Sequence, residues 1–181
     1  VAFGIYGIAL TISSYSLPLA VSKMVSARGA KGEYRNMRTV VTNALGYAVI
    51  AGLLAMNILF FGAGAFERLY DRPGLEMPLR VLAPTTFIVA LLGVFRGYFQ
   101  GHGDMVPTSI SQILEQIVNA GISVFATWQF LKIYEDSDQA ASFGAAGGTF
   151  GTLAGAAAAL LFMGFLFMSS SVQYQGQLNP N

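Results

Sequence analysis

The chain has no cysteine, only one histidine in 181 residues, and only 10% charged residues. The lack of cysteine excludes disulfides and thiolate metal sites, and the single histidine, His102, argues against a metal centre. No Cys–His or Ser–His pair is evident for nucleophilic catalysis. We therefore expect no enzymatic activity, no cofactor, no metal and no nucleic-acid partner.

Long stretches also lack charge altogether. Residues 39–66, 81–95 and 139–181 contain no Asp, Glu, Lys or Arg, while 54% of the chain is hydrophobic and its mean hydropathy is +0.57. A helix needs about 20 apolar residues to cross the hydrocarbon layer. No short alternating segments of a β-barrel are evident. The sequence therefore predicts an all-α, polytopic transmembrane bundle located in the cell membrane.

The apolar runs predict about five membrane spans, at residues 2–26, 38–63, 79–101, 107–131 and 142–168. They form one domain over residues 1–168, followed by a polar tail at 169–181. By the positive-inside rule, the basic connection after the first span lies in the cytoplasm. Because successive connections lie on alternating sides of the membrane, six basic residues are then inside and four outside. The six inside are Lys23, Arg28, Lys31, Arg35, Arg38 and Arg96.

Three motifs carry a family resemblance. They are LPLAVSKMVSARGAKGEYRN at 17–36, FRGYFQGHGDMVPTSISQILEQIVN at 95–119 and AAGGTFGTLAG at 145–155. In this order and spacing they resemble the stage V sporulation protein B-like polysaccharide biosynthesis branch of the multidrug/oligosaccharidyl-lipid/polysaccharide exporter superfamily. The resemblance covers nearly all of the chain up to residue 168.

The resemblance implies a bacterial inner-membrane flippase that moves lipid-linked polysaccharide or peptidoglycan precursors from the cytoplasmic to the outer leaflet. Such proteins have two helical bundles facing a central cavity, so we expect a fragment with about helices two to six of the first bundle. The implied partners are the lipid-linked sugar, membrane lipids, the missing second bundle and a coupling cation.

Charged residues inside the motif at 95–119 are costly in a membrane unless they face a partner or water. Glu115 lies roughly 12 Å and Arg96 roughly 7 Å from the same membrane face at 1.5 Å rise per residue, so the two can pair. Polar residues recur on the same side of the fifth span; they are Thr108, Gln112, Glu115, Asn119 and Ser123.

Two interpretations of this polar side remain open. In the first, Arg96 and Glu115 clamp the helical hairpin, and Gln112 and Asn119 bond neighbouring helices. In the second, these residues line a transport cavity, where Arg96 binds a pyrophosphate in one conformation and returns to Glu115 in the other.

The first span contains Ser14, Ser16 and Pro18, which predict a polar patch and a kink. The kink is either a packing feature or a gating bend. Lys23, near the end of this span, can reach toward a cavity entrance. In the last span, Gly147, Gly151 and Gly155 recur every four residues and predict close helix packing.

Other functions fit parts of the pattern. A cation-coupled multidrug exporter of the same superfamily also uses an intramembrane carboxylate, but an acidic cavity suits it better than a basic one. A membrane glycan polymerase needs large outer loops, and those expected here are short. A non-transporting scaffold predicts polar stripes that are packed and dry.

Overall fold

A computed structural model of the chain describes residues 1–13, 16–32, 34–71, 73–133 and 140–178. These residues contain no strand. Their helices are α1 (Ala2–Ser13), α2 (Ser16–Gly29), α3 (Tyr34–Leu69), α4 (Glu76–Gly101), α5 (Val106–Ile133) and α6 (Ala140–Leu178). The predicted all-α fold is confirmed.

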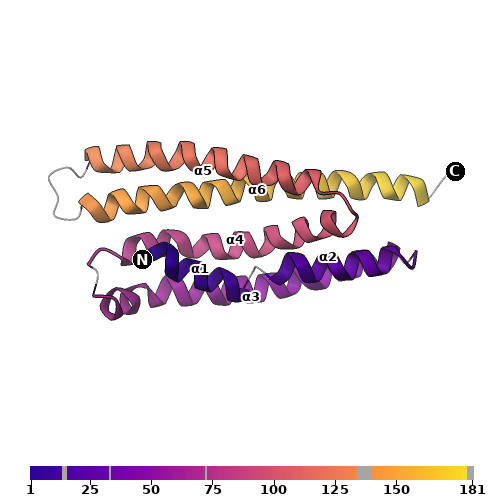
Figure 1. The fold of residues 1–181 in the computed structure, drawn as a ribbon, viewed down its shortest axis with the longest axis horizontal. Coiled ribbons are helices and arrows are strands. Elements are labelled where there is room, and N and C mark those ends of the chain that lie inside the picture. The colour runs from indigo at the N-terminus through magenta and orange to yellow at the C-terminus, as the bar shows by residue number, and fades with distance from the viewer. Residues whose placement is uncertain (14–15, 33, 72, 134–139, 179–181) are drawn as a thin grey trace.

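The helices from α3 onward alternate in direction along one long axis (Figure 1). Helices α2 and α4 end, and α3 and α5 begin, at one end of the bundle. Helices α3 and α5 end, and α4 and α6 begin, at the other. The basic connection after α2 and the turn after α4 therefore share one end. This is the arrangement that the predicted membrane topology requires.

Within the part of the chain that the structure describes, three helices are long and apolar enough to cross a membrane by themselves, at Thr39–Leu69, Glu76–Gly101 and Ala140–Ser170. This finding supports a helical membrane bundle. Helix α5 is long enough, but its apolar character is diluted by polar side chains such as Gln112 and Asn119. That α5 crosses the membrane, as the predicted five spans require, stays a prediction.

The described residues of the stretch 2–26 lie in two helices, with α1 ending at Ser13 and α2 beginning at Ser16. At the other end of the chain, α6 continues into the predicted polar tail as far as Leu178. Serine and glutamine are tolerated in a helix, and the segment has no proline before Pro180 to stop it.

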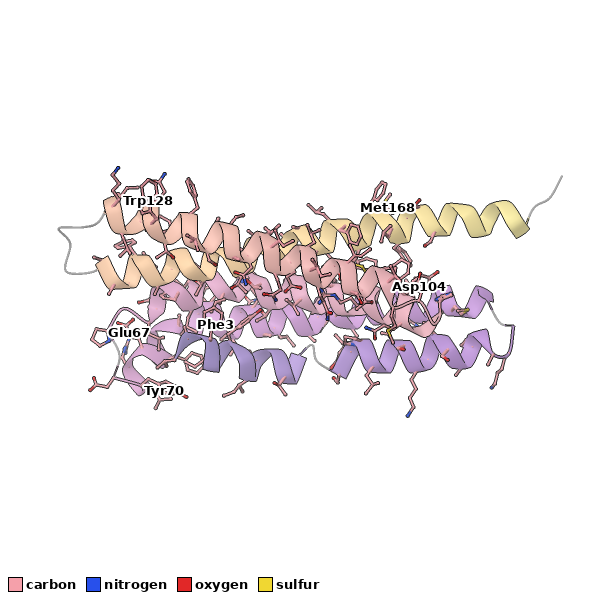
Figure 2. The ribbon with its side chains drawn as sticks, turned by 45° about the horizontal axis from the view of Figure 1, so that its top comes forward. Phe3, Glu67, Tyr70, Asp104, Trp128 and Met168 are labelled. Atoms are coloured by element: carbon pink, nitrogen blue, oxygen red, sulfur yellow. The ribbon has the colours of Figure 1, made fainter. Side chains whose placement is uncertain are left out.

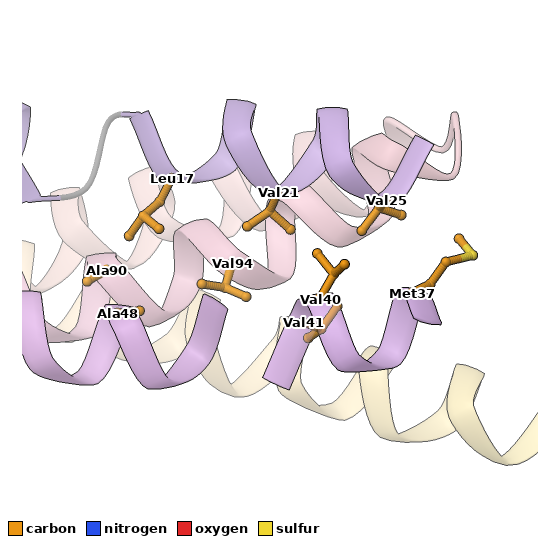
Figure 3. Packing of buried hydrophobic residues seen from close by; sticks show 9 residues of the cluster. All are labelled: Leu17, Val21, Val25, Met37, Val40, Val41, Ala48, Ala90 and Val94. Atoms are coloured by element: carbon orange, nitrogen blue, oxygen red, sulfur yellow. The ribbon is translucent and has the colours of Figure 1, made fainter. Parts of the chain in front are cut away.

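Helix α4 is the central element of the bundle. In the most apolar 18-residue stretch of α4, 56% of the residues are buried. The corresponding stretches of α3 and α6 are 17% and 28% buried. Its Ala90 and Val94 pack with the α2 residues Leu17 and Val21 and with Val41 of α3 (Figure 3). Farther round α4, Leu92 and Phe99 pack against Ala159 and Met163 of α6. Side chains of α4 are therefore held on several sides.

Glycine lets α2 cross α4 closely. A Cβ atom on Gly97 would lie 2.6 Å from the carbonyl oxygen of Pro18, and one on Gly101 would lie 2.6 Å from Cβ of Val25. Both distances are far below van der Waals contact, so only glycine fits without moving the helices apart. This contact fixes the rotation of α4 directly beside Arg96.

A short turn sets the register between α4 and α5. Gly103 has a φ of 80°, in the left-handed region where glycine is favoured. The Asp104 amide donates to the carbonyl oxygen of Phe99 at 3.1 Å, which closes the end of α4. The Asp104 carboxylate then accepts from the Val106 amide at 3.0 Å and caps α5, with Pro107 in the first turn.

Candidate functional site

Arg96 of α4 and Glu115 of α5 form an ion pair inside the bundle. Arg96 Nη2 lies 2.8 Å from Glu115 Oε2, and the side chains are 14% and 19% exposed. The membrane depths counted in the sequence allow these two residues to pair, and the structure contains this pair. Because each charge neutralises the other, neither incurs the full cost of an isolated charge in a low-dielectric interior.

Ser111 holds the other side of the guanidinium. Arg96 Nε donates to Ser111 Oγ at 3.0 Å, and the same hydroxyl donates to the carbonyl oxygen of Thr108 at 2.7 Å. Ser111 is fully buried. The arginine is therefore gripped through two nitrogen atoms by two consecutive turns of α5, which fixes the plane of its guanidinium.

Sequence reasoning missed Ser111 and selected its neighbour Gln112. The structure buries Ser111, whereas Gln112 is exposed. Ser111 lies four residues before Glu115 and Gln112 lies three before it, so both spacings fit one helical face. The similar membrane depth of Arg96 and Glu115 could have pointed to Ser111, because a serine one helical turn from Glu115 is within reach of the Arg96 side chain.

Asn119 and Ser123 face α6 rather than α4. Ser123 Oγ lies 2.9 Å from Asn119 Oδ1 and 2.7 Å from the carbonyl oxygen of Gly148. One turn farther along, Thr127 Oγ1 donates to the carbonyl oxygen of Gly144 at 3.3 Å. The bonds to Gly148 and Gly144 join side chains of α5 to the backbone of α6, as hydrogen-bonding residues often do between membrane helices. The predicted polar side is thus divided among α4, α6 and the exposed surface.

The glycine face of α6, made of Gly147, Gly151 and Gly155, lies against the backbone of α5. A Cβ atom on Gly155 would lie 2.5 Å from the carbonyl oxygen of Glu115, and one on Gly151 would lie 2.5 Å from that of Asn119. Helix α6 therefore touches α5 at the level of the ion pair, and it positions Glu115 by packing against its backbone.

We expect Gly155→Ala to destabilise the protein by about 1–3 kcal/mol, because the added methyl group overpacks this contact. Gly164→Ala is the matched control on the same helix. A Cβ atom at Gly164 meets nothing within 4 Å, so this change should leave stability unchanged or raise it by up to about 1 kcal/mol through helix propensity. Unfolding in detergent measures both; equal midpoints for the two variants would contradict this packing.

The remaining predicted site residues lie on α2 or just before it. Ser16 is its first residue and is exposed, and Lys23 is exposed farther along the same helix. Pro18 lies in the first turn of α2, where its missing amide costs no helical hydrogen bond. The predicted kink at Pro18 stays a prediction, because residues 14 and 15, between α1 and α2, lie outside the described residues. Ser14 lies outside the described residues.

A similar glycine signal on α4 was available in the sequence. Gly93, Gly97 and Gly101 recur every four residues, like the glycine face of α6. Two of them, Gly97 and Gly101, leave room for α2 to pack closely beside Arg96.

Among the described residues no group of three His, Cys, Asp or Glu side chains could hold a metal ion.

Comparison with known proteins places the chain in a family. A family model described as polysaccharide biosynthesis protein matches residues 1–178. The lipid II flippase MurJ of Bacillus subtilis (strain 168) is 32% identical over 138 residues, which cover 71% of this chain and 25% of that protein. The stage V sporulation protein B of the same organism is 30% identical over 157 residues, covering 86% of this chain and 29% of that protein.

An uncharacterized membrane protein of the same organism, YabM, is 26% identical over 168 residues, covering 91% of this chain and 29% of that protein. The chain thus spans between a quarter and three tenths of the length of these relatives. No solved structure matches it. With its apolar helices, these relatives indicate a multi-pass protein of the bacterial cell membrane. The resemblance is confirmed: the chain belongs to the polysaccharide biosynthesis protein family.

Proposed function

We propose that this chain is part of a transporter that moves lipid-linked sugar precursors, of polysaccharide or peptidoglycan, from the cytoplasmic to the outer leaflet. The observation that carries the proposal is the Arg96–Glu115 pair held between α4 and α5. The name of one relative, a lipid II flippase, agrees with such a substrate. The activity belongs to the full-length protein, including its second helical bundle.

In this proposal Arg96 exchanges partners during transport. The planar guanidinium that now contacts Ser111 and Glu115 is equally suited to two oxygen atoms of a diphosphate. When the substrate arrives, its negative charge replaces that of Glu115. When it leaves, Glu115 neutralises Arg96 again, so the empty site carries no unpaired charge during the return.

A cation-coupled multidrug exporter is the second candidate, since it also needs an intramembrane carboxylate. Glu115 could serve there only after losing its 2.8 Å contact with Arg96, and a protonated or cation-bound Glu115 would then leave the arginine unpaired. The pair therefore favours an anionic cargo. A coupling cation remains compatible with the anionic cargo if it binds Glu115 while Arg96 holds the phosphate.

Cysteine labelling tests whether this part of the bundle faces substrate. We expect Gln112→Cys in the full-length protein, with cysteines elsewhere removed, to react with a charged thiol reagent and to be protected by lipid-linked precursor. Ile117→Cys is the matched control, because Ile117 is 67% exposed on the apolar side of the same helix and should face lipid. It should remain unlabelled.

Labelling of both positions would show that α5 is bathed in water on all sides and would contradict a lipid-facing side. No labelling at Gln112 would place this residue in a dry contact between helices, and the scaffold interpretation would then replace the transport one. Labelling without protection by the precursor would leave a water-filled cavity that does not hold this substrate, which also contradicts the proposal.

A further inference from the structure

The exposed surface of α5 has two chemically different sides. Gln112 and Gln116, four residues apart and both exposed, form what we call the amide row. About a third of a turn away lies an apolar side with large exposed side chains, formed by Ile110, Ile113, Ile117, Val124 and Trp128. Lipid chains suit the apolar side. Two carboxamides inside a membrane require hydrogen-bonding partners instead.

The amide row adjoins the ion pair. On a helix with 3.6 residues per turn, Gln112 neighbours Glu115 and Gln116 on the surface. The Glu115 side chain is 19% exposed, so part of its surface is accessible at the edge of the row. No hydrogen bond joins either glutamine amide to another side chain among the residues that the structure describes. Both are therefore available to a molecule that approaches Arg96.

The chemistry of the row differs from that of the ion pair. A carboxamide is uncharged and offers one acceptor oxygen and two N–H donors, which matches hydroxyl and acetamido groups better than phosphate. Gln112 and Gln116 are separated by roughly 6 Å along the helix axis, from 1.5 Å rise per residue, which is comparable to the width of one sugar ring. A charged guanidinium instead suits the phosphate.

We propose that the amide row is a sugar subsite: Gln112 and Gln116 bind the sugar of a lipid-linked substrate whose diphosphate binds Arg96. This inference rests on the proposed function and adds to it the residues that distinguish a glycosylated lipid from a bare one. Arg96 then supplies affinity for any lipid diphosphate, and the amide row supplies preference for the sugar. Removing an amide should weaken only the glycosylated ligand.

Binding to the purified full-length protein tests this division, with two probes: a polyprenyl diphosphate carrying a disaccharide, and the same lipid diphosphate without sugar. We expect the double change Gln112→Leu with Gln116→Leu to weaken binding of the glycosylated probe about tenfold, since about two neutral hydrogen bonds are lost. Binding of the bare probe should be unchanged. Arg96→Lys should weaken both probes.

The matched control is Ile113→Leu with Ile117→Leu, on the apolar side of the same helix, which should alter neither affinity. If the double glutamine variant does not fold, the single change Gln116→Met keeps the side-chain length and should still weaken the glycosylated probe alone. Equal weakening of both probes, or of neither, overturns the sugar subsite. A lower unfolding temperature with both affinities reduced would identify the row as a contact with the rest of the protein, which also overturns it.

Failure of the inference can be separated from failure of the proposed function. If the wild-type protein binds neither probe, or if Arg96→Lys changes neither affinity, the flippase proposal itself fails. If the wild-type protein binds both probes through Arg96 and the glutamine variants bind them equally well, only the sugar subsite fails.

Discussion

Replacing Arg96 by lysine in the full-length protein should reduce flipping of the lipid-linked precursor by about tenfold or more while the protein remains folded. Lysine keeps the positive charge and can still pair with Glu115. It cannot reproduce the planar contact through Nε to Ser111 and Nη2 to Glu115, nor bind two phosphate oxygens side by side. Flipping in reconstituted vesicles measures the loss, and the unfolding temperature reports the fold.

Arg80→Lys is the matched control for this substitution. Arg80 lies on the same helix and pairs with Glu76 one turn away, but the two side chains are 51% and 40% exposed. An exposed pair contributes little to stability, and it lies at the opposite end of α4 from the ion pair. We expect wild-type flipping from this variant. Wild-type flipping from Arg96→Lys would remove Arg96 from the transport mechanism.

The overall arrangement could be predicted because a membrane determines two features of the sequence. Segments that cross it lack charged residues, and loops on its cytoplasmic side are rich in basic residues. Charge-free runs located the cores of α3, α4 and α6, and each of these helices extends past one or both ends of its predicted span. The ends of the molecule carry polar and aromatic residues, with Asp104 at one end and Glu67, Tyr70 and Trp128 at the other (Figure 2).

The ion pair was predictable for a similar reason. Arg96 and Glu115 flank a short turn, so their depths can be counted in residues from Gly101 and Pro107 without knowing how the helices pack. Which neighbour each polar residue of α5 contacts could not be counted in this way. Those contacts depend on where α6 lies. Asn119 and Ser123 contact α6, whereas Ser111 and Glu115 bind Arg96 of α4.

Whether the first predicted span is one kinked helix or two helices stays a prediction, because residues 14 and 15, between α1 and α2, lie outside the described residues. Serines beside Pro18 fit a kinked continuous helix and also fit a new helix beginning at Ser16. Tertiary packing fixes where α2 lies: Leu17, Val21 and Val25 are buried in the cluster that contains Val41 and Val94, and Gly97 leaves room for the carbonyl oxygen of Pro18. Neither contact is visible in the sequence of α2 alone.

Removing one partner of the ion pair should cost far more than removing both. We expect Glu115→Leu to lower the free energy of unfolding by about 2–4 kcal/mol, because it leaves the Arg96 guanidinium, whose side chain is only 14% exposed, without its counter-charge. The double change Arg96→Met with Glu115→Leu should restore most of this loss, since apolar side chains of similar volume replace both charges. Unfolding in detergent measures the three proteins.

Transport separates the two interpretations that the sequence left open. If the pair only clamps the hairpin, the double variant recovers flipping together with stability. If Arg96 binds the diphosphate, the double variant recovers stability but stays inactive, and this is the result we expect. Glu76→Leu, which removes one partner of the exposed pair with Arg80, should cost less than about 1 kcal/mol. Equal stability of Glu115→Leu and the double variant would contradict an energetic coupling between Arg96 and Glu115.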